Sequence, residues 1–544
     1  MTADDGGFNL LDEPWIVVLT PHGDEKQVSV LEVFEKAPDL VTIGGEVPTQ
    51  GFAITRLLLA FLHRAIDGPE DGDDWEELWR AGSLPMEEIT TYAGRVRHRF
   101  DLFDATQPFF QVPGLRSAKD EVSGLEKIVA DVPNGAPYFT TRSAASLERI
   151  EAAEAARWLV NTQAFDPSGI KTGAVDDPKA KGGKGYPIGP GWSGQIGGVL
   201  PEGRNLRETL LLNLIGREAS DYVRIGGRDD VPPWERDVDG PTWDEDRPPA
   251  GAIDLYTWQT RRIRLVGDRR GVTGVVLANG DKIQPHNRNP VEPHTTWRHS
   301  EPQSKKFKQV VYMPRVHDPS RSVWRGLGAM LPSLSGRRTS GQEPRPSLAP
   351  GVLQWISDLV RRDSLPEDYP VRNRIVGVEY GPQSATFAEI VDDVLAMTAA
   401  LINEESVELG RTAEGAVQDA ENVAYAVWTL ADNIAQAAGA ERGSGAGDRP
   451  REALYAALET PYRRWLGELR SGTDAQQART SWQLTVRDAC WPIVNEVLES
   501  AGPAAWRGRT INSRLVNVSV AEAWFRASLR KHLALAFATD EETQ

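Results

Sequence analysis

Four histidines that lie close together in the sequence are the first residues that could carry chemistry. They are His286, His294, His299 and His317, and the last is followed by Asp318. Imidazole and carboxylate groups together bind divalent cations, as in metal-dependent phosphohydrolases with a His-Asp dipeptide. The spacing matches no helix-based motif such as H-E-x-x-H, and the flanking residues are basic. We therefore expect scattered surface histidines and no bound metal, and an HD-type metal-dependent nuclease stays an alternative.

Other catalytic motifs are weak or missing. Residues 189–194 match G-x-G-x-x-G, but no apolar strand precedes them and prolines interrupt the segment, so a dinucleotide site is not expected. The sequence has no Walker A motif and no G-x-S-x-G nucleophile elbow. Cys490 is the single cysteine, which excludes an internal disulfide and a cysteine-rich zinc site. We expect a non-catalytic protein without a cofactor.

The positive charge of the chain is concentrated in one segment. The net charge of the 544 residues is -17, whereas residues 261–338 carry 16 Lys and Arg against 5 Asp and Glu. Three basic clusters could neutralise phosphates, namely Arg261-Arg262, Arg269-Arg270 and the lysines of residues 305–308. Interleaved aromatic rings could stack on bases. The segment favours either a nucleic-acid contact or a solvated basic face that docks an acidic partner.

The elements that must position these residues begin with a mixed α+β region. Residues 15–19 and 27–30 flank a turn and predict a hairpin, and residues 57–66 show the apolar spacing of a helix. Residues 169–203 contain 11 glycines and 4 prolines, which favours a long irregular loop. Residues 226–250 predict an acidic surface loop.

The basic segment itself favours strands. Residues 263–266 and 272–277 are rich in β-branched side chains, and Asn279-Gly280-Asp281 predicts a hairpin turn. Residues 308–313 predict a further strand.

From about residue 386 onward the spacing of apolar residues becomes helical, first over residues 387–395 and again over residues 454–469 and 525–537. We predict an α+β N-terminal domain with long loops over residues 1–380 and an all-α C-terminal helical bundle over residues 385–544.

Several motifs in this order resemble the CasA family, the large subunit of the type I-E CRISPR Cascade complex. Residues 8–16 (Phe-Asn-Leu-Leu-Asp-Glu-Pro-Trp-Ile) resemble its N-terminal signature, and residues 104–111 resemble its Pro-Phe-x-Gln segment. Residues 204–213 resemble the segment that leads into a helix after a glycine-rich loop. The resemblance covers nearly the whole chain, and it implies that the all-α C-terminal region is the family's four-helix bundle. The four cysteines that some family members carry for zinc are missing here.

The resemblance implies a DNA-recognition subunit without catalytic activity. Such a subunit holds the protospacer-adjacent motif of double-stranded target DNA and starts strand separation for the guide RNA. It then helps to recruit the CRISPR nuclease-helicase, alongside the other Cascade subunits. The polar, acidic N-terminus and the lack of a long apolar run lead us to expect a cytoplasmic protein with no membrane span.

The resemblance also assigns residues by position. Lys282 corresponds to a lysine finger in the minor groove, and we expect it at a hairpin tip. Gln383, after Gly381-Pro382, corresponds to a glutamine wedge inserted at the first base step. Gly169, Lys171 and Gly173 are our placement of the family's glycine loop. For docking at the 5′ end of the guide RNA we choose Tyr138, Phe139 and Thr140, with Phe139 as the stacking ring.

Two alternatives stay open beside this interpretation. The first is an acidic scaffold protein whose basic stripe docks an acidic partner, and the second is the HD-type nuclease named above.

Overall fold

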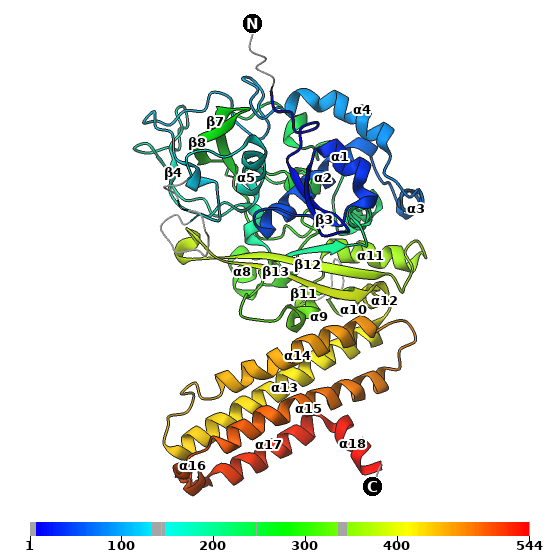
Figure 1. The fold of residues 1–544 in the computed structure, drawn as a ribbon, viewed down its shortest axis with the longest axis vertical. Helices are drawn as coiled ribbons and strands as arrows, with labels where there is room; N and C mark the ends of the chain where they lie inside the picture. The colour runs from blue at the N-terminus through cyan, green and yellow to red at the C-terminus, as the bar shows by residue number, and fades with distance from the viewer. Residues whose placement is uncertain (1–6, 133–142, 144–146, 246, 336–344, 543–544) are drawn as a thin grey trace. The chain divides into compact units, whose positions relative to one another are not determined.

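The structure is a computed structural model that describes residues 7–132, 143, 147–245, 247–335 and 345–542 (Figure 1). The chain folds into two compact units. The first comprises Met1–Ser320, Ser335–Pro366 and Val371–Val394, and the second comprises Arg321–Leu334, Glu367–Pro370 and Leu395–Gln544. None of the described helices combines the length and the apolar composition needed to cross a bilayer.

The first unit mixes small sheets with helices. Three strands pair in the order β2-β1-β3, and further sheets have the orders β10-β9-β11, β13-β12-β6, β4-β5 and β7-β8. Its strands are β1 (Ile16–Leu19), β2 (Glu25–Val28), β3 (Thr42–Ile43), β4 (Lys171–Thr172), β5 (Lys184–Gly185), β6 (Gly198–Glu202), β7 (Arg261–Asp268), β8 (Gly271–Asn279), β9 (Trp297–His299), β10 (Tyr312–Pro314), β11 (Ser347–Leu348), β12 (Pro370–Tyr380) and β13 (Phe387–Thr398).

Helix α2 (Pro48–Ile66) is the core of this unit, since its residues 49–63 are all buried. Phe61 stacks on Phe34 at 5.5 Å and meets Tyr92 edge-on at 4.8 Å. The other helices are α1 (Val30–Lys36), α3 (Gly72–Arg80), α4 (Met86–Val96), α5 (Ala152–Phe165), α6 (Leu206–Leu212), α7 (Ala252–Tyr256), α8 (Glu301–Phe307) and α11 (Gly351–Arg361).

The first elements agree with their sequence patterns. Strands β1 and β2 form the expected hairpin. Ser29 caps α1 with its side chain, and Glu32 returns the bond to the backbone of Ser29, which completes a capping box. The glycine-rich segment is more regular than expected, because β6 is a buried strand that pairs antiparallel with β12.

Three expectations for the basic segment and beyond are wrong. Asn279-Gly280-Asp281 is no hairpin turn: β7 and β8 are joined at Arg269-Arg270, and Gly280 lies at the far end of β8. A side chain at Gly280 would come within 2.5 Å of the Gln259 carbonyl, so this glycine serves close packing. Residues 308–311 are not a strand, because Lys308 ends α8 in a left-handed conformation.

The third concerns residues 387–395, which form strand β13 and not a helix. The apolar spacing of so short a segment fits a helix as well as a strand, and its β-branched residues favour a strand. Pairing with β12 decides the conformation. The first unit therefore continues past residue 380 to Val394.

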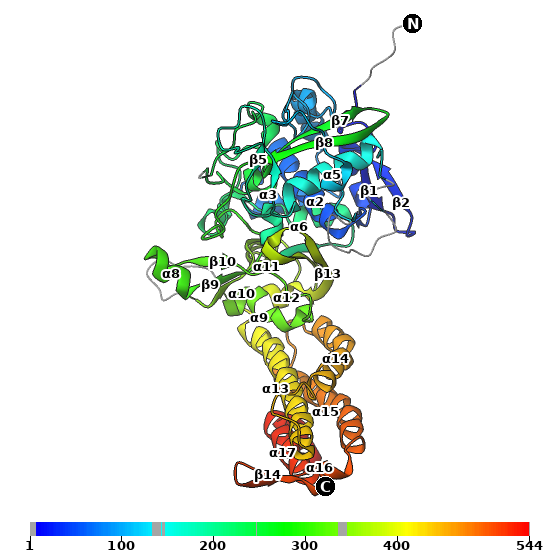
Figure 2. The ribbon, with the colours of Figure 1, turned by 90° about the vertical axis from the view of Figure 1, so that its left-hand side faces the viewer.

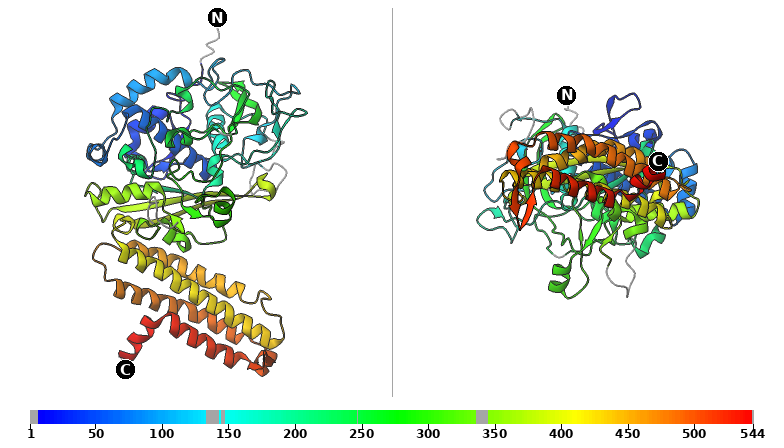
Figure 3. Two further views of the ribbon diagram at one scale, coloured as in Figure 1. Left: turned by 180° about the vertical axis from the view of Figure 1, so that it is seen from behind. Right: turned by 90° about the horizontal axis from the view of Figure 1, so that it is seen from below.

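The second unit is helical, as the C-terminal pattern predicted. Helix α13 contacts α14, α15 and α17, and α14 also contacts α15; Figure 2 and Figure 3 show these helices from further sides. Trp324 stacks on Tyr462 at 4.5 Å inside this unit. The helices are α9 (Leu327–Met330), α10 (Pro332–Ser335), α12 (Ala399–Ile402), α13 (Val407–Ala438), α14 (Asp448–Glu468), α15 (Ala475–Glu499), α16 (Pro503–Arg507), α17 (Val518–His532) and α18 (Ala534–Glu542), with strands β14 (Arg509–Ile511) and β15 (Arg514–Val516).

Cys490 lies on α15 and is fully buried. Burial raises the pKa of its thiol to about 12, and the thiol donates to the carbonyl of Arg487. The residue is a small core side chain, as its sequence neighbours suggested.

Candidate nucleic-acid interface

Gln383 lies at the tip of the hairpin that β12 and β13 form. The turn Pro382–Ser384 makes the tip, and both Gln383 (φ 59°) and Ser384 (φ 55°) are left-handed. Such a backbone is costly for residues other than glycine and is retained where the surroundings fix it. The N–H of Ser384 donates to the carbonyl of Gly381 at 2.9 Å and closes the turn. The turn thus presents an exposed amide side chain at the end of a two-stranded arm.

The base of this hairpin is tied to the segment that contains the candidate glycine loop. The hydroxyl of Tyr380, the last residue of β12, donates to the carbonyl of Phe165 at 2.6 Å. Phe165 is the last residue of α5, and the candidate loop begins four residues later at Gly169. The structure therefore brings together two regions that are more than 200 residues apart in the sequence.

A cavity of about 360 Å³ lies between these two regions. Gly169, Lys171 and Asn161 line one side, and the flank of the hairpin lines it at residues 385–387. Among the residues that the structure describes, none forms a hydrogen bond with the side-chain oxygen Oδ1 of the buried Asn161. Sequence analysis missed Asn161 and Asp166, because the pattern of a buried helix end does not distinguish cavity residues from core residues.

The three residues of the candidate glycine loop differ in their environment. Gly169 has φ of 144° and open space around its Cα, which fits a backbone that another molecule approaches. A side chain at Gly173 would come within 2.7 Å of the backbone of Gly183, so Gly173 serves packing of β4 against β5. Lys171 pairs with Asp166 at 2.6 Å. Burial lowers the pKa of Lys171, and the Asp166 carboxylate opposes that shift.

Lys282 follows β8 and does not lie at a hairpin tip, contrary to the expectation. Its backbone N–H donates to the carbonyl of Asp244 at 2.9 Å. The side chain is half-buried and forms no ion pair with any residue that the structure describes. Lys282 does not line the cavity beside the hairpin.

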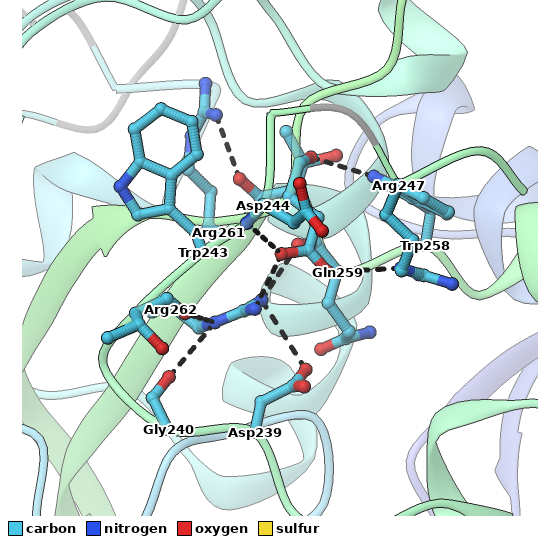
Figure 4. A network of polar contacts seen from close by, with 12 residues as sticks. Asp239, Gly240, Trp243, Asp244, Arg247, Trp258, Gln259, Arg261 and Arg262 are labelled. Atoms are coloured by element: carbon cyan, nitrogen blue, oxygen red, sulfur yellow. Dashed lines mark hydrogen bonds and ion pairs between the residues drawn. The ribbon is translucent and has the colours of Figure 1, made fainter. Parts of the chain in front are cut away.

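Two arginines expected to neutralise phosphates are buried in the first unit instead. Arg261 is 1% exposed, and its Nε lies 2.5 Å from Asp166 Oδ2. Arg262 lies 2.7 Å from Asp281 and 3.4 Å from Asp239 and donates to the carbonyl of Gly240 (Figure 4). Arg262 holds residues 239–242 against β7, whereas Arg261 holds residues 166–167 and Gly189, and the charge of both guanidinium groups is already neutralised.

Five other cations of the basic segment are exposed at the surface. Arg269 and Arg270 form the turn between β7 and β8 and pair with Glu13 and Asp268. Lys305, Lys306 and Lys308 are exposed on α8.

The four histidines do not converge. His294 is buried and its Nε2 contacts Asn213, whereas the Nε2 of His317 lies 3.1 Å from the carbonyl of Gly198. His299 contacts Ser304, and His286 stacks on Phe307. Across the part of the chain that the structure describes, no three His, Cys, Asp or Glu side chains meet as a metal site would require.

Tyr138, Phe139 and Thr140, the candidates for docking at the guide RNA, lie outside the described residues. The motifs that carried the family resemblance are structural. Asn205 caps α6 with its side chain, and the amide of Gln111 donates to the carbonyl of Leu102 at 2.8 Å.

Comparisons with known proteins give a consistent result. The model of the family described as CRISPR-associated protein Cse1 matches residues 9–493. CRISPR-associated protein CasA/Cse1 of Thermus thermophilus is 30% identical over 455 residues, which are 81% of this chain and 81% of that protein. The crystal structure of Thermobifida fusca Cse1 is 46% identical with a TM-score of 0.90 and covers 98% of this chain and 100% of that one. Cse1 from Acidimicrobium ferrooxidans is 31% identical with a TM-score of 0.81, over 98% of both chains.

Proposed function

The chain belongs to the Cse1 (CasA) family of CRISPR-associated proteins, and from this premise we propose that it is the DNA-recognition subunit of a type I-E Cascade complex. It has no catalytic role. It binds the protospacer-adjacent motif of double-stranded target DNA through the minor groove and starts the strand separation that forms the R-loop. It then helps to recruit the nuclease-helicase. The site of action is the cytoplasm.

The observation that carries this proposal is the hairpin tip at Gln383. The left-handed turn, with a proline on one side, holds the backbone of the exposed amide in place before DNA binds. Inserting a side chain into a base step costs a few kcal/mol of unstacking, which contacts to the opened strands offset. A turn that is already rigid also lowers the entropy cost of binding, because little side-chain and backbone freedom is lost.

The cavity beside the hairpin gives the second part of the proposal. Gly169 and Lys171 line it together with the hairpin flank, so a duplex that lies across this part of the surface can contact the glycine loop and the wedge at once. Gly169 lets the backbone come close to the groove. Gly173 supports the loop through its packing. Lys282 acts as a separate minor-groove contact, where a cation meets acceptor groups with limited sequence discrimination.

The remaining partners follow from family membership. Tyr138, Phe139 and Thr140 dock at the 5′ end of the guide RNA, with Phe139 stacked on a base. We assign α13, α14, α15 and α17 as the family's four-helix bundle, which contacts other Cascade subunits.

The test is a Cascade assembly that contains this chain and guide-matched duplex DNA with the flanking motif intact or scrambled. Duplex docking is followed by gel shift, and strand opening by the fluorescence of 2-aminopurine at the first base step. Gln383→Ala should slow opening about tenfold and leave docking within twofold, because a wedge acts after the duplex is bound.

Gln27→Ala is the matched control, since Gln27 is an exposed glutamine on β2. It should behave as wild type in both measurements. Equal losses of docking and opening in Gln383→Ala would contradict the wedge assignment. Binding that does not depend on the flanking motif would contradict the proposed function as a whole.

A further inference from the structure

Three glycines in residues 189–194 are not explained by the contacts with DNA proposed above. They are Gly189, Gly191 and Gly194, which match G-x-G-x-x-G in the sequence. A dinucleotide site needs an α-helix directly after the glycines, whereas this segment continues as a short 3-10 helix (Trp192–Gln195) and then as strand β6. The spacing of the glycines therefore has another cause, which their contacts show.

Two of these glycines allow other parts of the first unit to come close. A side chain at Gly191 would collide with the carbonyl of Ala164, near the end of α5. A side chain at Gly194 would collide with the hydroxyl of Tyr380. The segment is also bonded to the end of α5, because the N–H of Gly191 donates to the carbonyl of Asp166 at 2.9 Å.

The hydroxyl of Tyr380 lies between the glycine segment and the end of α5. It donates to the carbonyl of Phe165 at 2.6 Å. Burial raises the pKa of Tyr380 well above its usual value, so the hydroxyl keeps its proton and remains a donor. We call residues 164–166 and 189–194 together the socket of this side chain.

Tyr380 is also the root of the β12–β13 hairpin. The pairing of β12 with β6 covers residues 372–376, and Tyr380 contacts the socket four residues later. Its ring packs on Phe387 of β13 with centroids 5.5 Å apart, and the N–H of Gly381 donates to the carbonyl of Thr386 at 2.9 Å. The two strands are thus joined to each other and to the socket directly before the tip.

We propose that Tyr380 is a positioning residue for the wedge, because its hydrogen bond in the socket fixes the direction of the hairpin and so the place of Gln383. This inference rests on the proposed function, to which the wedge belongs. A wedge must meet one base step, and a hairpin that swings at its root loses that alignment. Gly194 has the matching role, since it leaves the space that the hydroxyl occupies.

The test uses the Cascade assembly with guide-matched duplex DNA, with docking followed by gel shift and opening by 2-aminopurine fluorescence. Hydrogen exchange of residues 378–388, measured by mass spectrometry on the full chain without DNA, reports the anchoring of the hairpin itself. Tyr380→Phe keeps the ring and removes the donor. It should slow opening about fivefold and leave docking within twofold, because one hydrogen bond is lost at a site that acts after docking. Exchange of the hairpin should become about fivefold faster.

Gly194→Ala perturbs the same contact from the side of the socket. It should slow opening about tenfold, because the added methyl group displaces the hydroxyl. The double variant with Tyr380→Phe should be no slower than Gly194→Ala alone, since both changes act on one contact. Effects that multiply in the double variant would contradict a shared contact.

Tyr462→Phe is the matched control, because the Tyr462 hydroxyl also donates to a backbone carbonyl, that of Ala413, inside the second unit. It should leave opening and hairpin exchange as in the wild type. An equal slowing of opening by Tyr462→Phe would overturn the inference, because the effect would then reflect a general loss of stability.

The inference and the proposed function can fail separately. If Tyr380→Phe opens the strands like wild type while Gln383→Ala slows opening, the positioning role is overturned and the proposed function stands. If Gln383→Ala itself opens the strands like wild type, the wedge assignment fails, and the role of Tyr380 in opening fails with it whatever the exchange shows.

Discussion

Two basic clusters of the same sequence segment have opposite fates in the structure. Arg261 and Arg262 lie in the core of the first unit, each on a carboxylate, whereas Lys305, Lys306 and Lys308 stand exposed on α8. The partners of the arginines are Asp166, Asp239 and Asp281, and the first is 95 residues away in the sequence. A run of positively charged residues therefore does not by itself predict nucleic-acid binding, because carboxylates that are distant in the sequence can neutralise it in the fold.

The difference also follows from side-chain chemistry. A guanidinium group forms several directed hydrogen bonds and tolerates burial beside a carboxylate, whereas an ammonium group is more strongly hydrated and stays at the surface. Arg261 donates to four backbone carbonyls besides its carboxylate, those of Thr260, Asp166, Pro167 and Gly189. Arg261 stabilises residues 166–167 beside the cavity, whereas the three lysines stay exposed to solvent.

The largest effect should come from removing a buried charge. Arg261→Ala leaves Asp166 buried with Lys171 as its remaining cation, and we expect a loss of about 3 kcal/mol in the free energy of unfolding. Urea denaturation followed by circular dichroism measures it. Arg270→Ala, at the exposed turn, should change the free energy by less than about 0.5 kcal/mol. Similar losses in both variants would break the distinction between the two clusters.

A second effect extends the comparison to histidine. Burial lowers the pKa of His63 to about 4, so this ring is neutral in the folded state and must become charged in the unfolded state at acid pH. Its contribution to stability is present above pH 6.5 and is lost as the pH falls toward 4. Between pH 7 and pH 5 the loss should be about 2 kcal/mol.

The variant that tests this is His63→Gln, which cannot titrate and should flatten the pH dependence of unfolding by that amount. His22→Gln, at an exposed turn, should retain the dependence of the wild type. A variant at His63 with an unchanged pH profile would show that burial of this ring is not the cause.

A smaller effect concerns duplex binding by Lys282, whose charge is unpaired within the described residues. In the Cascade assembly, Lys282→Ala should weaken docking up to about tenfold and lower the salt slope by about 1, as the loss of one phosphate or groove contact does. The measurement is a salt titration of duplex affinity. Docking that is insensitive to this change, with binding to an acidic partner protein reduced, would favour the acidic scaffold alternative.

The smallest effect should be that of the α8 lysines on folding. The triple alanine variant of Lys305, Lys306 and Lys308 should leave the free energy of unfolding within about 0.5 kcal/mol, because these side chains are exposed and unpaired within the described part of the chain. Urea denaturation again gives the value. A loss comparable to that of Arg261→Ala would show that these lysines stabilise the fold, contrary to the comparison.

Local patterns predicted the local features of this molecule well. The β1–β2 hairpin and the capping box at Ser29 depend on neighbouring residues alone. The turn at Gln383 is local as well, because Gly381-Pro382 restricts the backbone by itself. The helical character of the C-terminal region is confirmed, since its apolar spacing repeats over long segments.

Features that depend on distant partners could not be predicted. Strand β13 became a strand through pairing with β12, although its apolar residues also fit helical spacing. Asn279-Gly280 has the sequence of a turn, yet Gly280 packs against the backbone of residues 259–261. The cavity beside Gln383 joins segments more than 200 residues apart, and no local pattern marks Asn161 or Asp166 as its lining.

Because the thiol of Cys490 is buried, a label can be attached selectively to the hairpin tip for spectroscopy. A thiol with a pKa of about 12 is protonated and shielded at neutral pH, so it does not react with maleimides. A cysteine introduced as Gln383→Cys would then be the one reactive sulfur of the whole chain, without any background substitution. A fluorophore attached there would report in real time when the tip leaves water and enters the stack of bases.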